Sequence, residues 1–135
     1  DQVQLKLLKN PGYTAVGTYY YDDYVVIFAS LKKDLPDEDR LNYKDKFLQP
    51  DLFQWESMTN LPSSHLDKLR SSSFAYLFIR KVDNENGIVL PFTYVGKGKL
   101  MNCRKTDSGN GTYLFDIRME NELPDYLQYD FGLSR

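Results

Sequence analysis

The segment 74–82, FAYLFIRKV, constrains the fold more than any other part of the sequence. In an extended chain, successive side chains point to opposite faces of the sheet. Here Phe and Tyr alternate with Ala, Leu and Ile, so both faces of the strand are apolar. Such a strand is typical of the interior of a sheet, where neither face meets water. The segment therefore predicts a central strand.

Other extended segments are predicted where β-branched and aromatic residues gather between turn signals. These segments are 24–31, two short stretches within 43–58, 88–105 and 112–119. In 88–105, Pro91 indicates an edge position or a bulge, and Gly96 and Gly98 indicate a bend. Loops are predicted at 34–42, 83–87 and 107–111, and the opening 2–10 fits either a strand or the end of a helix.

Two helices are candidates. In 61–73, LPSSHLDKLRSSS, Ser63 or Ser64 would be the N-cap, and Leu66 and Leu69 would face inward. The segment 123–131 is either a short helix or an extended tail. Aromatic residues make up 15% of the chain, with eleven Tyr, which also favours β structure. We predict a mixed, mainly β fold: an open β-barrel, pseudobarrel or PUA-like, of about five to seven short strands with one or two short helices.

The length of 135 residues predicts a single domain, residues 1–135, with a core of its own. Because the chain begins with Asp1 rather than Met, we expect it to be excised from a longer multidomain protein. A single cysteine, Cys103, excludes an internal disulfide and favours a reducing, cytoplasmic compartment. No apolar run reaches the roughly 18 residues of a membrane span, and we expect no membrane partner.

The charge is unevenly distributed. The whole chain has a formal net charge of −2, which argues against an indiscriminate binder of polyanions. Residues 61–105, however, carry eight Lys and Arg against three Asp and Glu, a net charge of +5. Such a block is either one electropositive face or a set of scattered, solvated side chains. We leave both interpretations open.

Motifs for catalysis are missing. With one histidine, His65, and one cysteine, a zinc site with the usual ligands cannot be assembled. The GKGK at 96–99 lacks the framework of a phosphate loop. Asp45 and Glu56 invite comparison with metal-dependent nucleases, but the Glu-x-Lys that would follow is absent. We predict that the chain is not an enzyme and uses no metal or cofactor.

The only tryptophan, Trp55, lies in DLFQWESMTN, where alternation places Phe53, Trp55 and Ser57 on one face. Trp55 is either a core residue or a platform for a base swung out of a duplex. We expect Phe53 in the core and Trp55 at its rim. Basic residues interleaved with aromatic, hydroxyl and amide side chains also suit contacts to phosphates and base edges.

Several stretches together resemble a known family: LNYKDKFLQPDLFQWESM, FAYLFIRK, LPFTYVGKGKLM and YLFDIRMENELPDYL. They are similar to the domain of unknown function 3427, found at the C-terminus of bacterial helicase-like proteins, often behind a phospholipase-D-type nuclease module. The matching positions are Tyr43, Lys44, Asp45, Phe53, Trp55, Ser57, Phe78, Arg80, Phe92, Tyr94 and Gly96. Two features depart from the family: Met58-Thr59-Asn60 replaces Gln-Asn after Ser57, and the Gly-x-x-Tyr of the spacer is missing.

The resemblance implies a DNA-linked restriction or defence context. We therefore predict a non-catalytic DNA-recognition module of a bacterial restriction or helicase–nuclease system, with DNA and the parent helicase and nuclease domains as partners. The DNA-binding residues would be Trp55, Ser57, Asn60, Arg70, Arg80, Lys97, Lys99, Arg104 and Lys105. The alternative is a protein-interaction module that docks on the helicase or on a partner, because Tyr-rich surfaces make good anchors.

Overall fold

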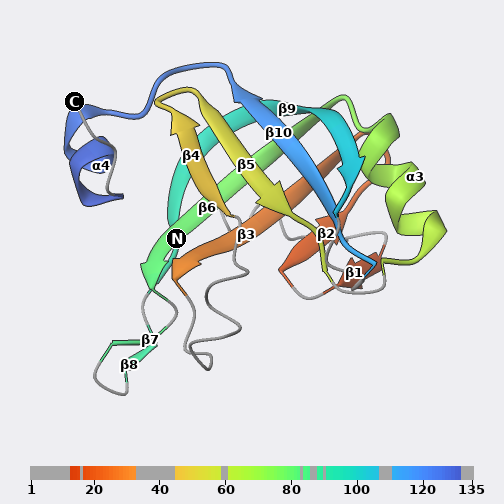
Figure 1. The fold of residues 1–135 in the computed structure, drawn as a ribbon, viewed down its shortest axis with the longest axis horizontal. Coiled ribbons are helices and arrows are strands. Elements are labelled where there is room, and N and C mark those ends of the chain that lie inside the picture. Colours follow the sequence, from red (N-terminus) through yellow and green to blue (C-terminus); the bar gives the residue numbers. More distant parts are fainter. Residues whose placement is uncertain are drawn as a thin grey trace.

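The computed structural model describes residues 13–15, 17–32, 45–58, 61–82, 84–85, 88–89, 91–106 and 111–131. Eight strands form one sheet in the order β1-β2-β3-β6-β9-β10-β5-β4 (Figure 1). Their bounds are β1 Tyr13–Ala15, β2 Thr18–Tyr20, β3 Tyr24–Lys32, β4 Lys46–Gln49, β5 Leu52–Glu56, β6 Phe74–Val82, β9 Thr93–Lys105 and β10 Tyr113–Met119. The short strands β7 (Asn84–Glu85) and β8 (Ile88–Val89) pair separately. Helix α3 (Ser63–Ser71) and helix α4 (Asp125–Asp130) lie at opposite ends of the sheet (Figure 1).

The segment 74–82 is a central strand, as its two apolar faces predict. It forms β6, which pairs in parallel with β3 and antiparallel with β9. The other pairs in the described part of the sheet are antiparallel. A parallel pair needs a crossover connection, and here the chain between β3 and β6 includes β4, β5 and α3.

Strand β9 bends the sheet because its two halves pair with different strands. Its first half pairs with β6 and its second half with β10, with a register shift in each pairing. Gly98 lies at the change of partner, where a Cβ atom would come within 2.7 Å of the carbonyl oxygen of Arg118. Only glycine fits so close an approach without a shift of the backbone. The bend predicted at Gly96 and Gly98 is therefore confirmed.

The bent sheet encloses the main core. Strands β4, β5 and β10 lie in front of β3 and β6 in Figure 1, and inward side chains of both groups form one buried cluster. Its fully buried members include Ile27 from β3, Leu77 from β6, Phe53 from β5 and Ile117 from β10. Among the described residues, β1 and β4 remain edge strands, so the sheet does not close. The mainly β, open-barrel fold is confirmed, with one strand more in the sheet than predicted.

Several local predictions need correction or confirmation. Helix α3 begins at Ser63 after Pro62, which occupies the N-cap position without a side-chain hydrogen bond, so neither predicted serine is the N-cap. Leu69 is buried and Leu66 packs against the core, as predicted. Pro91 lies between β8 and β9 and interrupts neither strand. The segment 123–131 contains helix α4 and is not an extended tail.

The predictions for 2–10, 34–42, most of 83–87 and 107–110 lie outside the described residues. Among the residues that are described, no helix has both the length and the apolar character to cross a membrane.

Candidate functional site

Trp55 is a core residue, and its expected place at the rim of the core is corrected. Its side chain is 5% exposed, and its ring centroid lies 5.8 Å from that of Phe115 on β10. Alternation correctly placed Phe53 and Trp55 on one face, but that face is the interior of the bent sheet. A buried indole offers no surface on which a base can stack. We therefore remove Trp55 from the candidate DNA-binding residues.

Ser57 completes the pairing of β5 with β10. Its backbone N–H donates to the carbonyl of Tyr113 at 2.8 Å, and its Oγ accepts from the N–H of Tyr113 at 2.9 Å. The same hydroxyl donates to the carbonyl of Met58 at 3.2 Å. Because Ser57 is buried and these bonds use its hydroxyl, its role is structural. Asn60, the third candidate of this segment, lies outside the described residues.

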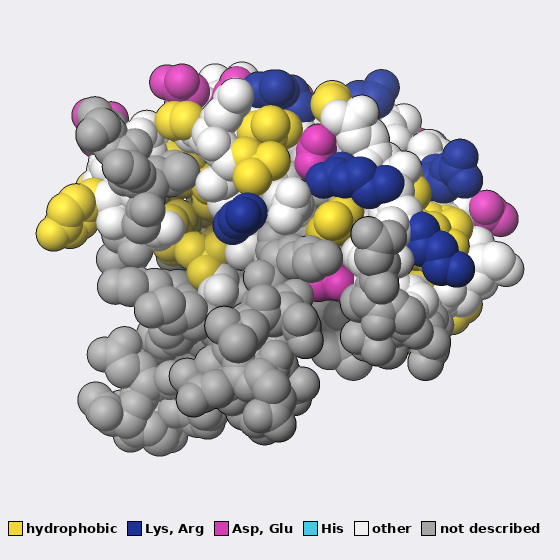
Figure 2. All heavy atoms as spheres, viewed as in Figure 1, with side chains coloured by type: hydrophobic (Ala, Val, Ile, Leu, Met, Phe, Trp, Pro, Cys, Tyr) yellow, Lys and Arg dark blue, Asp and Glu magenta, His cyan; other side chains and the backbone are white. Residues whose placement is uncertain are grey.

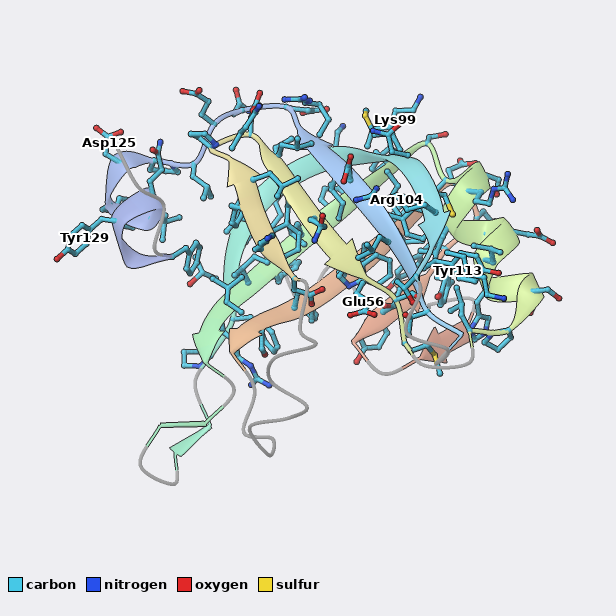
Figure 3. The ribbon with its side chains drawn as sticks, viewed as in Figure 1. Glu56, Lys99, Arg104, Tyr113, Asp125 and Tyr129 are labelled. Atoms are coloured by element: carbon cyan, nitrogen blue, oxygen red, sulfur yellow. The ribbon has the colours of Figure 1, made fainter. Side chains whose placement is uncertain are left out.

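Arg104 is held on the outer face of the sheet by groups from three strands. Its Nη1 donates to the carbonyl of Asn102 at 2.7 Å. Its Nη2 donates to Gln54 Oε1 at 3.2 Å and to Asp116 Oδ1 at 3.1 Å. Figure 3 shows the side chain lying over β10 in the direction of β5. These three hydrogen bonds fix the position of the guanidinium group.

The bulge in β9 makes this arrangement possible. Asn102 has a positive φ of 53°, a conformation that Asn adopts more readily than most residues. Its side-chain amide donates to Asp116 Oδ2 at 2.9 Å, so the two oxygens of this carboxylate bind Asn102 and Arg104. The bulge also keeps Arg104 on the outer face, while the preceding Cys103 packs against the core.

Asp45 and Glu56, considered above as a nuclease pair, have other partners. Asp45 Oδ1 accepts from the backbone N–H of Glu56 at 2.7 Å. Glu56 Oε2 accepts from the hydroxyl of Thr112 at 2.7 Å, which lies 2.7 Å from the hydroxyl of Thr106. These bonds tie the ends of β5, β9 and β10 together. Among the described residues, no group of three His, Cys, Asp or Glu side chains is placed to hold a metal ion.

Four of the candidate basic residues lie on two elements in contact, three on β9 and one on α3. We call this the β9–α3 basic surface, and it consists of Arg70, Lys99, Arg104 and Lys105. Figure 2 shows Lys and Arg side chains spread over β10, β9 and α3 on the viewed face. In the described part of the chain, Arg70, Lys99 and Lys105 are exposed and form no ion pair.

The surroundings of the Cys103 thiol show that Arg70 of α3 and Arg104 of β9 lie near the same point. Burial raises the pKa of this thiol, and the positive charges of Arg70 and Arg104 act in the opposite direction. Both arginines are therefore near the same sulfur atom, although they are far apart in the sequence. Arg118 on β10 lies opposite Lys99 and pairs with Asp51 at 3.0 Å.

The remaining two candidates, Arg80 and Lys97, lie elsewhere. Arg80 Nε donates to the hydroxyl of Ser30 at 2.6 Å, and its guanidinium carbon lies 4.3 Å from the ring centroid of Phe92. Lys97 Nζ lies 4.6 Å from the ring centroid of Phe74 and 3.6 Å from Glu120 Oε2. The structure thus separates these two cations from the β9–α3 basic surface.

Both cations border a cluster of aromatic side chains that sequence reasoning missed. We call it the outer aromatic face, because it covers the side of β3, β6 and the start of β9 that faces away from the main core. It consists of Tyr19, Tyr21, Tyr24, Phe28, Phe74, Tyr76, Phe78, Phe92 and Tyr94, with Val26. The signal was present in the sequence, since aromatic residues alternate along 74–78, and Tyr24 and Phe28 lie on one side of their strand with Val26 between them.

The rings of this face pack on one another in a regular manner. Tyr24 stacks between Tyr21, at 4.7 Å between ring centroids, and Phe74, at 5.2 Å. Tyr76 meets Tyr24 and Phe74 edge-on. Burial raises the pKa of the Tyr21, Tyr24 and Tyr94 hydroxyls above the usual value of 10.0. The face is therefore a second, partly exposed core.

Comparison with models of known protein families gives a match. Residues 4–131 match the model of the family described as Domain of unknown function (DUF3427). This match covers nearly the whole chain and confirms the resemblance found in the sequence motifs. No curated protein matches the chain.

Proposed function

The chain belongs to the family of domain of unknown function 3427, and we propose that it is a non-catalytic DNA-recognition module. In this proposal it serves a bacterial restriction or helicase–nuclease defence system in the cytoplasm and binds DNA through the β9–α3 basic surface. The observation that carries the proposal is that α3 and β9, which are in contact, carry three exposed cations, Arg70, Lys99 and Lys105, together with the pre-positioned Arg104.

The local charge decides whether such a surface attracts DNA. The chain as a whole is slightly negative, so attraction depends on a patch whose cations are not neutralised by neighbouring carboxylates. Asp116 neutralises Arg104 and Asp51 neutralises Arg118. The charges of Arg70, Lys99 and Lys105 remain available to phosphates.

The residues of this surface divide into two roles. The exposed lysines sit on flexible stems and suit phosphate contacts, which position a protein on DNA without reading its sequence. Arg104 and the adjacent amide of Asn102 are fixed in place and carry hydrogen-bond donors of the kind that read base edges. In this proposal, affinity comes mainly from the lysines and discrimination from the fixed pair.

The test is fluorescence anisotropy with labelled DNA at several salt concentrations. The probes are single strands and duplexes, unmodified and carrying methylated, hydroxymethylated or phosphorothioate sites. If about three phosphates are contacted, the logarithm of the binding constant should fall with the logarithm of the salt concentration with a slope of about −3. Each of the variants Lys99→Glu and Lys105→Glu should weaken binding and reduce this slope.

A control with the same change in net charge is available on α4, at the opposite end of the sheet from α3 (Figure 1). Tyr126 and Tyr129 are exposed, so Tyr126→Glu with Tyr129→Glu lowers the net charge by two, as Lys99→Glu does, but away from the proposed surface. This double variant should leave DNA affinity nearly unchanged. The proposal fails if the wild-type chain binds none of these DNAs, or if the double variant weakens binding as much as Lys99→Glu.

A protein-interaction module is the second candidate, and helix α4 favours it. Tyr126 and Tyr129 are 70% and 87% exposed, and their spacing of three residues places them on one side of the helix. Exposed tyrosines suit docking on the parent helicase or on a partner protein. Such docking would lose little affinity between low and moderate salt, and Tyr126→Ala with Tyr129→Ala would weaken it.

A further inference from the structure

The outer aromatic face has opposite charges at its two ends. At one end, Asp22 and Asp23 are exposed in the turn that leads into β3. At the other end, Arg80 lies next to Ser30, six residues further along the parallel strands. Six residues of strand span about 20 Å. Lys97 lies opposite Tyr76, its ammonium group is above the Phe74 ring, and its charge is paired with Glu120.

The ring geometry disfavours one class of ligand for this face. Nucleic-acid bases bind aromatic side chains by stacking on exposed ring faces. Here Tyr24 has a ring stacked on each face, Phe74 lies between Tyr24 and the Lys97 ammonium, and Arg80 covers Phe92. These three rings are therefore already in contact with a neighbour over at least one face, which leaves less room for a stacked base. Half-buried ring edges and hydroxyls suit the packing of another protein surface.

The positions of the charges on the outer aromatic face indicate that the other protein surface is the same face of a second copy of the chain. The acidic turn and Arg80 lie at similar distances on either side of Tyr76 and Val26. A two-fold axis that lies in the interface above this midpoint, parallel to the sheet and perpendicular to β3 and β6, would place Arg80 of one copy over Asp22 and Asp23 of the other, twice. Isologous interfaces require this kind of self-complementarity. We propose that the outer aromatic face is the interface of a homodimer, with Tyr76 near the two-fold axis.

The size of the outer aromatic face indicates how tightly the two copies should bind each other. The outer aromatic face and its charged ends comprise fewer residues than the 20 to 30 per partner of a standard interface. The dimer should therefore be weak and dissociate on dilution. This inference does not depend on DNA binding, because the β9–α3 basic surface takes no part in it.

Sedimentation equilibrium of the wild-type chain up to about 100 μM should show a monomer–dimer equilibrium. Two variants then reverse the sign of the charge at one end of the face each: Asp22→Lys with Asp23→Lys at the acidic end, and Arg80→Glu at the basic end. Each variant alone should be monomeric over the same range, because each places like charges opposite one another at both ends of the interface.

Mixing the two variants gives the decisive result. In a mixed dimer, positions 22 and 23 of the first variant, now positive, lie opposite position 80 of the second variant, now negative. At the other end of the interface, the unchanged Arg80 of the first variant lies opposite the unchanged Asp22 and Asp23 of the second. The equimolar mixture should therefore dimerise although neither variant does. As a matched control, Asp67→Lys with Glu122→Lys changes two exposed carboxylates outside this face and should dimerise like the wild type.

Three results would overturn the proposal: a wild-type chain that stays monomeric, a dimer unaffected by the reversal at Asp22 and Asp23, or a mixture that stays monomeric. Since Asp22 and Asp23 are exposed, their variant should fold. Circular dichroism of Arg80→Glu checks that its loss of dimer is not a loss of fold. If that variant does not fold, Arg80→Gln replaces it in the mixture, with partial recovery expected.

Discussion

The two halves of the outer surface of one sheet differ in what they contribute. Over β3, β6 and the start of β9, the outer surface is aromatic and partly buried. Over β5, β10 and the end of β9, it carries Arg104, Asp116 and their hydrogen-bonded neighbours. The bend at Gly98 separates the two halves. One strand, β9, thus contributes to a second core with its first half and to a charged surface with its second.

This difference indicates where stability and recognition reside. A strand with two apolar faces needs cover on both, and β6 has the main core on one side and the outer aromatic face on the other. The charged half of the surface has a core on one side alone. Its polar residues can therefore vary at small cost in stability, which suits a surface that contacts a ligand.

Truncating the outer aromatic face should have the largest effect. Phe78 is fully buried there, so Phe78→Ala should lower the free energy of unfolding by about 3–5 kcal/mol. The matched change on the charged half is Leu114→Ala, at a half-buried position, which should cost about 1 kcal/mol or less. Urea unfolding followed by circular dichroism measures both. Equal losses would contradict the contrast between the two halves.

The boundary between the halves should be almost as sensitive. In Gly98→Ala, the new Cβ would lie 2.7 Å from the carbonyl oxygen of Arg118 and 2.9 Å from Ile117 Cγ2. The backbone must shift, at a cost of about 1–3 kcal/mol. The expected result is a lower midpoint of urea unfolding. An unchanged midpoint would mean that β9 can bend elsewhere.

Much of this contrast could be read from the sequence, but only where the signal was local. The central strand followed from two apolar faces within 74–82, and the bend followed from Gly96 and Gly98. The depth of Trp55 did not follow, because alternation shows which residues share a face and not which face is inside. The parallel pairing of β3 with β6 also left no local trace.

The candidate site shows the same limit. Arg104 depends on Gln54, 50 residues away, and on Asp116, across a bulge that the sequence did not indicate. Lys97 and Lys99 are two residues apart and looked equivalent, yet Lys97 covers Phe74 while Lys99 is exposed at the basic surface. The bend between them decides this, so the positive block 61–105 is not one electropositive face.

On the charged half, Arg104→Ala should have a small effect on stability. The Arg104–Asp116 pair is at 3.1 Å with the arginine side chain 39% exposed, and such pairs contribute about 0.2–1 kcal/mol. A double-mutant cycle with Asp116→Ala isolates the pair from its neighbours. A coupling well above 1 kcal/mol would show that the network stabilises the fold and is not chiefly an arrangement for a ligand.

The tyrosines of the outer aromatic face should make the domain less stable at high pH. Burial raises the pKa of Tyr21, Tyr24 and Tyr94 above 10.0 in the folded chain. Above about pH 10 the unfolded chain therefore releases these protons more readily, and the free energy of unfolding falls as the pH rises. Urea unfolding between pH 8 and pH 11 should show this loss.

Cys103 complicates the alkaline loss, because the pKa of its thiol is also raised, above 9.0. The variant Cys103→Ala removes that contribution and should keep most of the loss above pH 10. If the variant shows no alkaline loss, the thiol and not the aromatic face is responsible.

The smallest effect is expected for Tyr21→Phe, and its sign is informative. The Tyr21 hydroxyl is buried and, within the described structure, has no hydrogen-bond partner. A buried unsatisfied polar group costs about 1–3 kcal/mol, so its removal should leave stability unchanged or raise it slightly at neutral pH. Phe keeps the ring that stacks on Tyr24. The gain should increase above pH 10, because one tyrosine with a raised pKa is gone. A clear loss at neutral pH would show instead that the hydroxyl is bonded in solution, and that this end of the outer aromatic face is more polar than its rings suggest.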